Sequence, residues 1–215
     1  MNMAALVGTA LLAFGLYSTT AASADEAPVR AHDMPGMEDM PAMDAIAGDS
    51  LYQLPMMLTS AEGRTFKLAE LRGRPLLITM FYSHCTSVCP LLTAQLQHLT
   101  RQLAPAERHQ VRVLMVSFDT ARDTPEVLRA FKAEHHIQGA NWLITRAPAS
   151  DVRALAAALG IQYRELADHS FNHSAVLSVT DREGTVRART SQLSGSDASF
   201  LAAVRAQLAV ADAKP

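Results

Sequence analysis

The chain carries only two cysteines, Cys85 and Cys89, and they lie four residues apart. The apolar run over residues 76–82 predicts a strand before them, and leucines at helical spacing follow them. Pro90 suits the first turn of that helix. The N–H groups and positive dipole end of a helix N-terminus favour thiolate over thiol. The pattern therefore predicts a reactive pair, suited to redox chemistry or to binding a soft metal.

A purely structural disulfide is the simpler alternative. A bond between residues four apart closes a very small loop, so it removes little entropy from the unfolded chain. We therefore favour a functional role for the pair.

The N-terminus resembles an export signal. Residues 1–24 contain no charged residue, and the apolar stretch 4–17 leads to Ala22-Ser23-Ala24, a pattern that predicts cleavage after Ala24. Because no Lys or Arg precedes the apolar stretch, an uncleaved membrane anchor is the alternative. A stretch of 14 residues is short for a span that needs about 20. We expect a periplasmic protein, where a disulfide can persist, with a membrane-anchored form facing the periplasm as the alternative.

Residues 25–50 have the composition of a flexible linker. Within residues 31–44, called here the methionine segment, Met34, Met37, Met40 and Met43 are interleaved with proline and glycine. Proline and glycine argue against a regular helix. Thioethers are soft ligands that suit Cu(I), so metal capture is one interpretation of the segment and an inert tether is the other.

The rest of the chain has the size and composition of one globular domain, expected over residues 51–212. The 215 residues are 49% hydrophobic and 19% charged, enough for a full core. The formal net charge of −2 indicates no basic face for nucleic acid, so we expect no nucleic-acid partner.

Strand-like and helix-like segments alternate through this domain. In chain order they are a strand over 52–58, a short strand and helical turn over 66–71, a strand over 76–82, a helix over 90–103, a strand over 111–118, a helix over 125–135, a strand over 141–145, a helix over 150–159, a hairpin of 175–180 with 185–190, and a helix over 196–210. The order predicts an α/β, thioredoxin-like fold: a mixed central sheet flanked by helices, with an N-terminal strand extension.

Three blocks of this sequence resemble the Sco/SenC family of copper chaperones for cytochrome oxidase assembly. Residues 81–90 are similar to its Cys-x-x-x-Cys-Pro motif, residues 116–126 to its acidic turn after a strand, and residues 172–184 to its histidine eight residues before a second acidic turn. The blocks occur in the family's order and cover about residues 51–210.

The resemblance implies that Cys85 and Cys89 bind copper as thiolates and that one histidine completes the site. His173 and His169 compete for that role, and we assign His173 because only it lies at the family's distance from the acidic turn. His169 is then expected on a surface loop. His84 is expected to point away from the metal, behind its ligands.

Four further residues near these blocks have less specific interpretations. Asp119 and Asp123 could orient the site or set its charge. Thr124 or Asp123 could instead cap the helix expected to follow, and we prefer capping for Asp123. Phe118 and Trp142 are expected to be core aromatics.

Two thiolates and an imidazole suit Cu(I), and with a further ligand Cu(II), although zinc also accepts such a set. The leading hypothesis is a periplasmic metallochaperone that delivers copper to the dinuclear copper centre of a cytochrome c oxidase subunit. Such a protein is not a catalyst in the strict sense, and it needs a periplasmic thiol reductant because a disulfide removes both thiolates. The alternatives are a thiol-disulfide oxidoreductase that uses the redox-active pair Cys85 and Cys89, or copper sequestration under stress.

Overall fold

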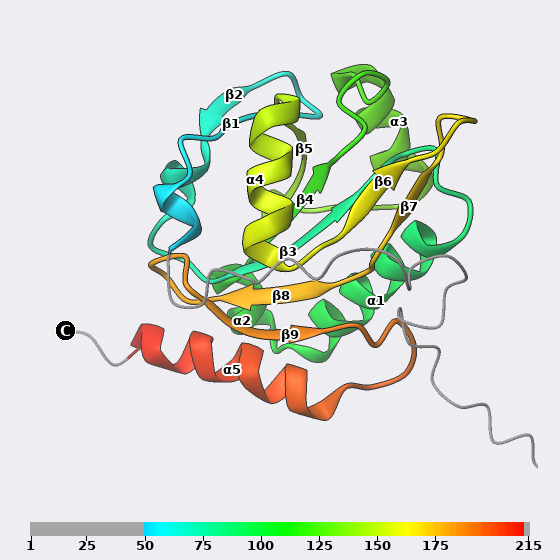
Figure 1. The fold of residues 1–215 in the computed structure, drawn as a ribbon. Helices are drawn as coiled ribbons and strands as arrows, with labels where there is room; N and C mark the ends of the chain where they lie inside the picture. Colours follow the sequence, from blue (N-terminus) through cyan, green and yellow to red (C-terminus); the bar gives the residue numbers. More distant parts are fainter. Residues whose placement is uncertain (1–49, 213–215) are drawn as a thin grey trace, which may run out of the picture.

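A mixed sheet of seven strands organises the computed structural model, which describes residues 50–212 (Figure 1). Its strand order is β2-β1-β5-β4-β3-β8-β9, and β6 and β7 form a separate two-stranded sheet. The elements are η2 (Leu51–Gln53), β1 (Met57–Ser60), β2 (Thr65–Lys67), η3 (Leu68–Leu71), β3 (Leu76–Phe81), α1 (Val88–Gln102), α2 (Pro105–Gln110), β4 (Arg112–Ser117), α3 (Pro125–Glu134), β5 (Trp142–Arg146), α4 (Ala149–Leu159), β6 (Tyr163–Glu165), β7 (Phe171–His173), β8 (Leu177–Thr180), β9 (Val186–Thr190) and α5 (Ala198–Asp212).

The centre of the sheet is parallel and its flanks are antiparallel. Strand β4 pairs in parallel with β3 and with β5, whereas β1 lies antiparallel to β5 and β8 lies antiparallel to β3. Every residue of β3 is buried, which explains why its sequence is almost continuously apolar. The predicted mixed sheet and N-terminal strand extension are confirmed, the extension being the β1–β2 hairpin.

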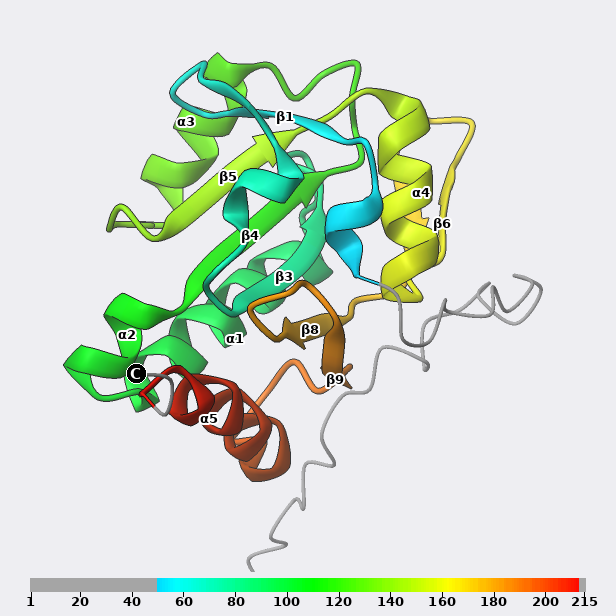
Figure 2. The same cartoon turned by 90° about the vertical axis from the view of Figure 1, so that its left-hand side faces the viewer.

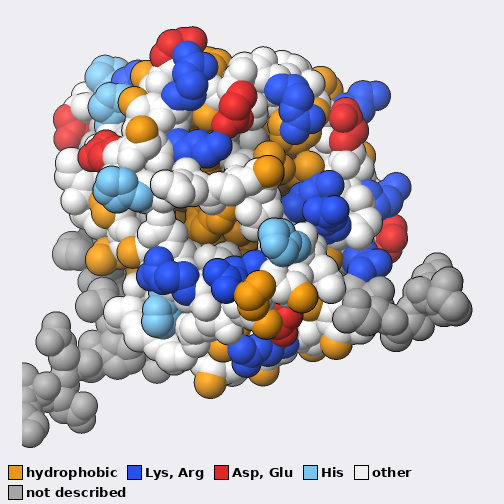
Figure 3. All heavy atoms as spheres, turned by 180° about the vertical axis from the view of Figure 1, so that it is seen from behind, with side chains coloured by type: hydrophobic (Ala, Val, Ile, Leu, Met, Phe, Trp, Pro, Cys, Tyr) orange, Lys and Arg blue, Asp and Glu red, His pale blue; other side chains and the backbone are white. Residues whose placement is uncertain are grey.

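Helices cover both faces of the sheet. Helix α4 lies on one face and α1 and α3 lie on the other, as the two views of the ribbon agree (Figures 1 and 2). Helix α5 runs beside β9 and α2 at one side of the molecule (Figure 1). The face seen from behind in Figure 3 carries interspersed positive and negative side chains around a hollow with a hydrophobic floor. Among the described residues, no helix is long and apolar enough to cross a membrane.

The sequence-based expectations fail mainly at short elements. The strand expected over 52–58 is instead the 3-10 turn η2 followed by β1, because Ser50 caps a turn at Tyr52 before the chain becomes extended. Helix α2 and the β6–β7 hairpin were not predicted, and each has strands or turns too short to show a clear hydrophobic period. The predicted signal at 1–24 and the linker up to residue 49 lie outside the described residues.

Candidate metal centre

The two cysteines lie at the junction between β3 and α1. The Cys85 N–H donates to the Tyr82 carbonyl at 3.3 Å and closes a turn just after β3, and Cys89 lies in the first turn of α1. Both side chains are buried, and both are free thiols. Helix α1 begins at Val88, two residues before the expected start at Pro90, so that Cys89 is itself helical.

This geometry gives the two thiols opposite acidities. Cys85 Sγ accepts a hydrogen bond from the Cys89 backbone N–H at 3.3 Å. The hydrogen bond from the Cys89 side chain, assisted by His173 and by backbone N–H groups, outweighs burial and holds the pKa of Cys85 well below its ordinary value. Burial, followed by the neighbouring Cys85 thiolate, raises the pKa of Cys89 well above its ordinary value. The reduced pair therefore carries one negative charge at neutral pH.

His173 lies beside the cysteines at the end of β7. The register of the β6–β7 hairpin pairs His173 with Tyr163, and the Ser174 N–H donates to the Gln162 carbonyl at 2.9 Å, which holds the end of the hairpin. The Nδ1 atom of His173 lies 3.1 Å from the Ser174 carbonyl oxygen. A carbonyl oxygen only accepts, so Nδ1 donates to it, and Nε2 is the ring nitrogen that faces the cysteines. That Nε2 atom lies 3.7 Å from Cys89 Sγ.

One sulfur from each cysteine and one ring nitrogen of His173 all lie within 4.8 Å of one another. They come from three parts of the chain: the turn after β3, the start of α1, and β7. Two thiolates and an imidazole form a soft donor set that suits Cu(I), and such a set can also hold zinc. The arrangement can bind a metal when the pair is reduced, and it cannot do so once both sulfurs are joined in a disulfide.

Aromatic rings surround the histidine. The rings of Phe118 and Tyr82 have their centroids 4.9 Å and 5.9 Å from that of His173, and both meet it edge to face. Phe171 packs on both of these rings. The two expected core aromatics, Phe118 and Trp142, are buried as predicted, but Phe118 also fixes the plane of the imidazole, a role that its position in the sequence did not suggest. In the sequence, only the aromatic character of Tyr82 and Phe171 pointed to such a cluster.

Asp123 does not cap α3, so our prediction for it is wrong. Thr124 caps that helix, with its hydroxyl accepting from the Val127 N–H at 3.4 Å. The fully buried Asp123 carboxylate instead accepts from the Ser83 N–H at 3.1 Å and from the hydroxyls of Ser83 and Ser117. It thereby ties the turn after β3, two residues before Cys85, to the end of β4.

The other acidic residue and the two remaining histidine candidates lie outside the three-donor cluster. Asp119 is buried and pairs with Arg122, whose Nε lies 2.5 Å from its carboxylate. His84 is exposed, and its Nδ1 lies 2.9 Å from the Ser83 hydroxyl and 4.0 Å from an Asp123 carboxylate oxygen. The His84 ring, Asp119 and Asp123 form a second group of potential donors, but both carboxylates already have the protein partners given above.

His169 is exposed at the tip of the β6–β7 hairpin, as expected for a surface loop residue. Its backbone φ is +62°, and its Nδ1 lies 2.8 Å from Glu165. The hairpin thus brings His173 to the cysteines and turns His169 away from them.

Known proteins share both sequence and fold with this chain. The SCO1 protein homolog of Bacillus subtilis is 30% identical over 88 residues, which are 41% of this chain and 45% of that protein. The chain therefore spans less than half the length of this curated relative. BsSco, a member of the Sco family of cytochrome c oxidase assembly proteins in which a disulfide switch is identified, superposes with a TM-score of 0.64 at 20% identity, over 75% of this chain and 97% of BsSco.

The copper-bound ScoI of Bradyrhizobium japonicum superposes with a TM-score of 0.61 at 20% identity, over 71% of this chain and 97% of ScoI. These likenesses confirm the predicted thioredoxin-like fold. The family model described as SCO1/SenC matches residues 45–209, which include the cysteine turn, the acidic turn after β4 and His173. The chain belongs to the SCO1/SenC family.

Proposed function

We propose that this protein is an exported copper metallochaperone that holds copper through Cys85, Cys89 and His173. The observation that carries the proposal is the convergence of two sulfurs and one imidazole nitrogen within 4.8 Å in a buried site. Family membership supports copper over zinc, since the related ScoI has been described with copper bound. We propose the dinuclear copper centre of cytochrome c oxidase as the destination, in line with the assembly role of the family to which BsSco belongs.

The residues around the site have distinct parts in loading. Cys85 enters as a thiolate, whereas the Cys89 thiol must lose its proton when copper binds. The Ser174 carbonyl accepts the hydrogen bond of His173 Nδ1, which leaves Nε2 as the ring nitrogen that binds copper. Release would proceed by exchange of these ligands for those of the recipient, a transfer that requires no covalent catalysis. We therefore propose that the protein is not a catalyst in the strict sense.

Loading also depends on the redox state of the pair. Formation of a disulfide would remove two electrons and both thiolate ligands, so a thiol reductant must return those electrons before copper can bind. Since we expect the protein in the periplasm, we propose a periplasmic thiol reductant as its second partner.

The test is copper stoichiometry and affinity on the reduced full chain, measured by competition with a Cu(I) chelator. We expect His173→Ala and Cys85→Ser each to lose one tightly bound copper relative to the unchanged protein. His169→Ala is the matched control, because this exposed histidine lies four residues away at the tip of the same hairpin, and it should bind as the unchanged protein does. Equal binding by the His173→Ala and His169→Ala variants would overturn the assignment of His173.

One observation favours a second function, thiol-disulfide exchange. The lowered pKa of Cys85 makes it a competent attacking or leaving sulfur. Cys85 is nevertheless only 7% exposed, which restricts access by a protein disulfide. A reductase should retain most of its dithiol exchange in His173→Ala, whereas the chaperone loses copper in that variant.

The third hypothesis, copper sequestration, predicts that deletion of residues 31–44 removes most copper binding while the His173-dependent copper remains.

A further inference from the structure

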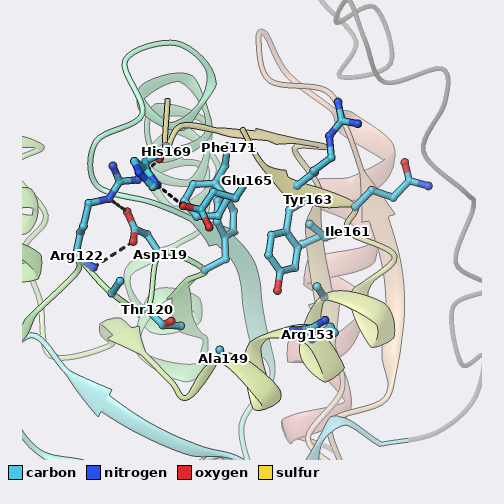
Figure 4. Close-up of a pocket in the computed structure, with 15 residues that line it drawn as sticks. Asp119, Thr120, Arg122, Ala149, Arg153, Ile161, Tyr163, Glu165, His169 and Phe171 are labelled. Atoms are coloured by element: carbon cyan, nitrogen blue, oxygen red, sulfur yellow. Dashed lines mark hydrogen bonds and ion pairs between the residues drawn. The ribbon is translucent and has the colours of Figure 1, made fainter. Parts of the chain in front are cut away.

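A groove of about 820 Å³ is lined by Phe118 and Phe171, two members of the aromatic cluster around His173. We call it the arginine-rimmed groove and define it by Phe118, Arg122, Arg153, Ile161, Tyr163 and Phe171. Figure 4 shows the Tyr163 ring between β6 and α4, with Arg122 and Asp119 across the groove from it and Arg153 on α4 below. Phe118 stacks on Tyr163 with centroids 5.2 Å apart, and it also contacts the His173 ring. A single aromatic ring thus separates the groove from the candidate metal centre.

Some charged side chains on the lining of the groove form ion pairs and others do not. The two carboxylates on its lining, Asp119 and Glu165, are paired with Arg122 and His169. Arg153 and Arg164 are exposed on the lining, and within residues 50–212 neither forms an ion pair. The groove therefore combines an aromatic floor with two positive side chains that have no carboxylate partner in the described part of the chain.

The N-terminal part of the same chain carries the complementary chemistry. Residues 25–49 contain seven Asp and Glu against one Arg, a net charge of −6, and because the whole chain carries −2 the remainder carries +4. Carboxylates pair favourably with guanidinium groups, and methionine sulfurs make favourable contacts with aromatic rings. The methionine segment, residues 31–44, offers both in alternation.

The described chain begins in a position from which this segment can reach the groove. Helix α4 lines the groove through Ala149, Arg153 and Ala156, and η2 lies beside this helix in both ribbon views (Figures 1 and 2). The Met57 N–H, at the start of β1, donates to Asp151 of α4 at 3.3 Å. Helix α4 is about 16 Å long at 11 residues. The chain takes seven residue-to-residue steps from Met43 to Ser50 and can span up to about 23 Å over them. It takes sixteen steps from Met34 and can span up to about 53 Å, so each methionine has enough chain to pass around the helix.

We propose that the methionine segment docks intramolecularly in the arginine-rimmed groove. Its carboxylates pair with Arg153 and Arg164, and its thioethers lie against Phe118, Tyr163 and Phe171. The tether raises the effective concentration of this segment over that of any free chain of similar composition. If the proposed copper function holds, docking also places four soft sulfur ligands one aromatic ring away from His173; the docking itself does not depend on copper.

The test is a carbon-13 methyl spectrum of the reduced, copper-free full chain labelled at methionine. Ring currents should shift at least two of the Met34, Met37, Met40 and Met43 methyl resonances away from that of free methionine, with assignments from single Met→Leu substitutions. The buried Met80 and Met115 report on folding in the same spectrum. Arg153→Glu with Arg164→Glu should return the shifted resonances to the free value.

The matched control is Arg101→Glu with Arg108→Glu, which makes the same change in charge on the exposed side of α1 and α2, and it should leave the shifts in place. Tyr163→Ala should reduce the shifts without moving Met80 or Met115. Four resonances at the free value in the unchanged protein, or shifts that the groove variant does not alter, would overturn the proposal. Shifts that disappear on dilution would overturn it too, since the groove would then hold the segment of a second chain. Because no copper is present, these outcomes are independent of the stoichiometry experiment.

Discussion

Replacing Asp123 should destabilise the reduced protein more than removing the cap of the adjacent helix does. Asp123→Ala removes an acceptor for three hydrogen bonds, those from the Ser83 N–H and from the hydroxyls of Ser83 and Ser117. At about 0.5–1.5 kcal/mol for each bond, and with the Ser83 N–H left without its acceptor, we expect a loss of about 3 kcal/mol in the free energy of unfolding. Thr124→Ala removes only the helix cap and should cost about 1 kcal/mol.

Asp123→Asn keeps the size and shape of the side chain but replaces one acceptor oxygen with an NH2 donor, so it tests the hydrogen bonds without leaving a cavity. Its amide oxygen can still accept from the Ser83 N–H, while its NH2 group can donate to a hydroxyl that reverses its role, so we expect a smaller loss of about 1 kcal/mol. Urea unfolding followed by the fluorescence of Trp142, the only tryptophan, measures all three variants. Asp123→Ala should also weaken copper binding, because Asp123 holds Ser83 in the turn that carries Cys85, whereas Thr124→Ala should not. A loss for Asp123→Ala no larger than that for Thr124→Ala would refute this reasoning.

Three further predictions concern the thiols and a turn. A pH titration of thiolate absorbance on the reduced protein should show one thiolate already present at pH 7 and a second appearing only well above pH 9. Cys85→Ala should abolish the first of these thiolates. Two thiols that titrate together near about pH 8.5 would contradict the opposite pKa shifts of Cys85 and Cys89. Since the pKa of Cys85 is lower in the folded protein than in the unfolded chain, its thiolate contributes to stability above about pH 8.5, and this contribution is lost as the pH falls through the folded pKa. The difference in urea midpoint between the unchanged protein and Cys85→Ala, measured across pH, should follow this loss. Gly184→Ala should lower the free energy of unfolding by about 1–3 kcal/mol, because Gly184 has a φ of +85° and a Cβ there would lie 2.7 Å from the Tyr52 ring. An unchanged urea midpoint would contradict this prediction.

The sequence by itself determined the central elements of this protein. The continuous apolar run that became β3 is hydrophobic because both of its faces are buried, so it is recognisable without any tertiary information. The spacing of Cys85 and Cys89 before a helical leucine pattern likewise indicated a reactive pair at a helix N-terminus. These signals are local, because burial on both faces of a strand and the start of a helix each determine the types of residues that follow one another in the sequence.

Only the tertiary structure decided how distant residues share the site. His173 and His169 differ by four positions, and the pairing of β6 with β7 determines that one lies 3.7 Å from Cys89 and the other at an exposed hairpin tip. Asp123 stands next to a helix start and was mistaken for its cap, because its true partners, Ser83 and Ser117, come from strand ends that become neighbours only in the folded sheet. The arginine-rimmed groove likewise joins the loop after β4 to α4 and the β6–β7 hairpin. Such contacts join residues far apart in the chain, and no local period in the sequence encodes them.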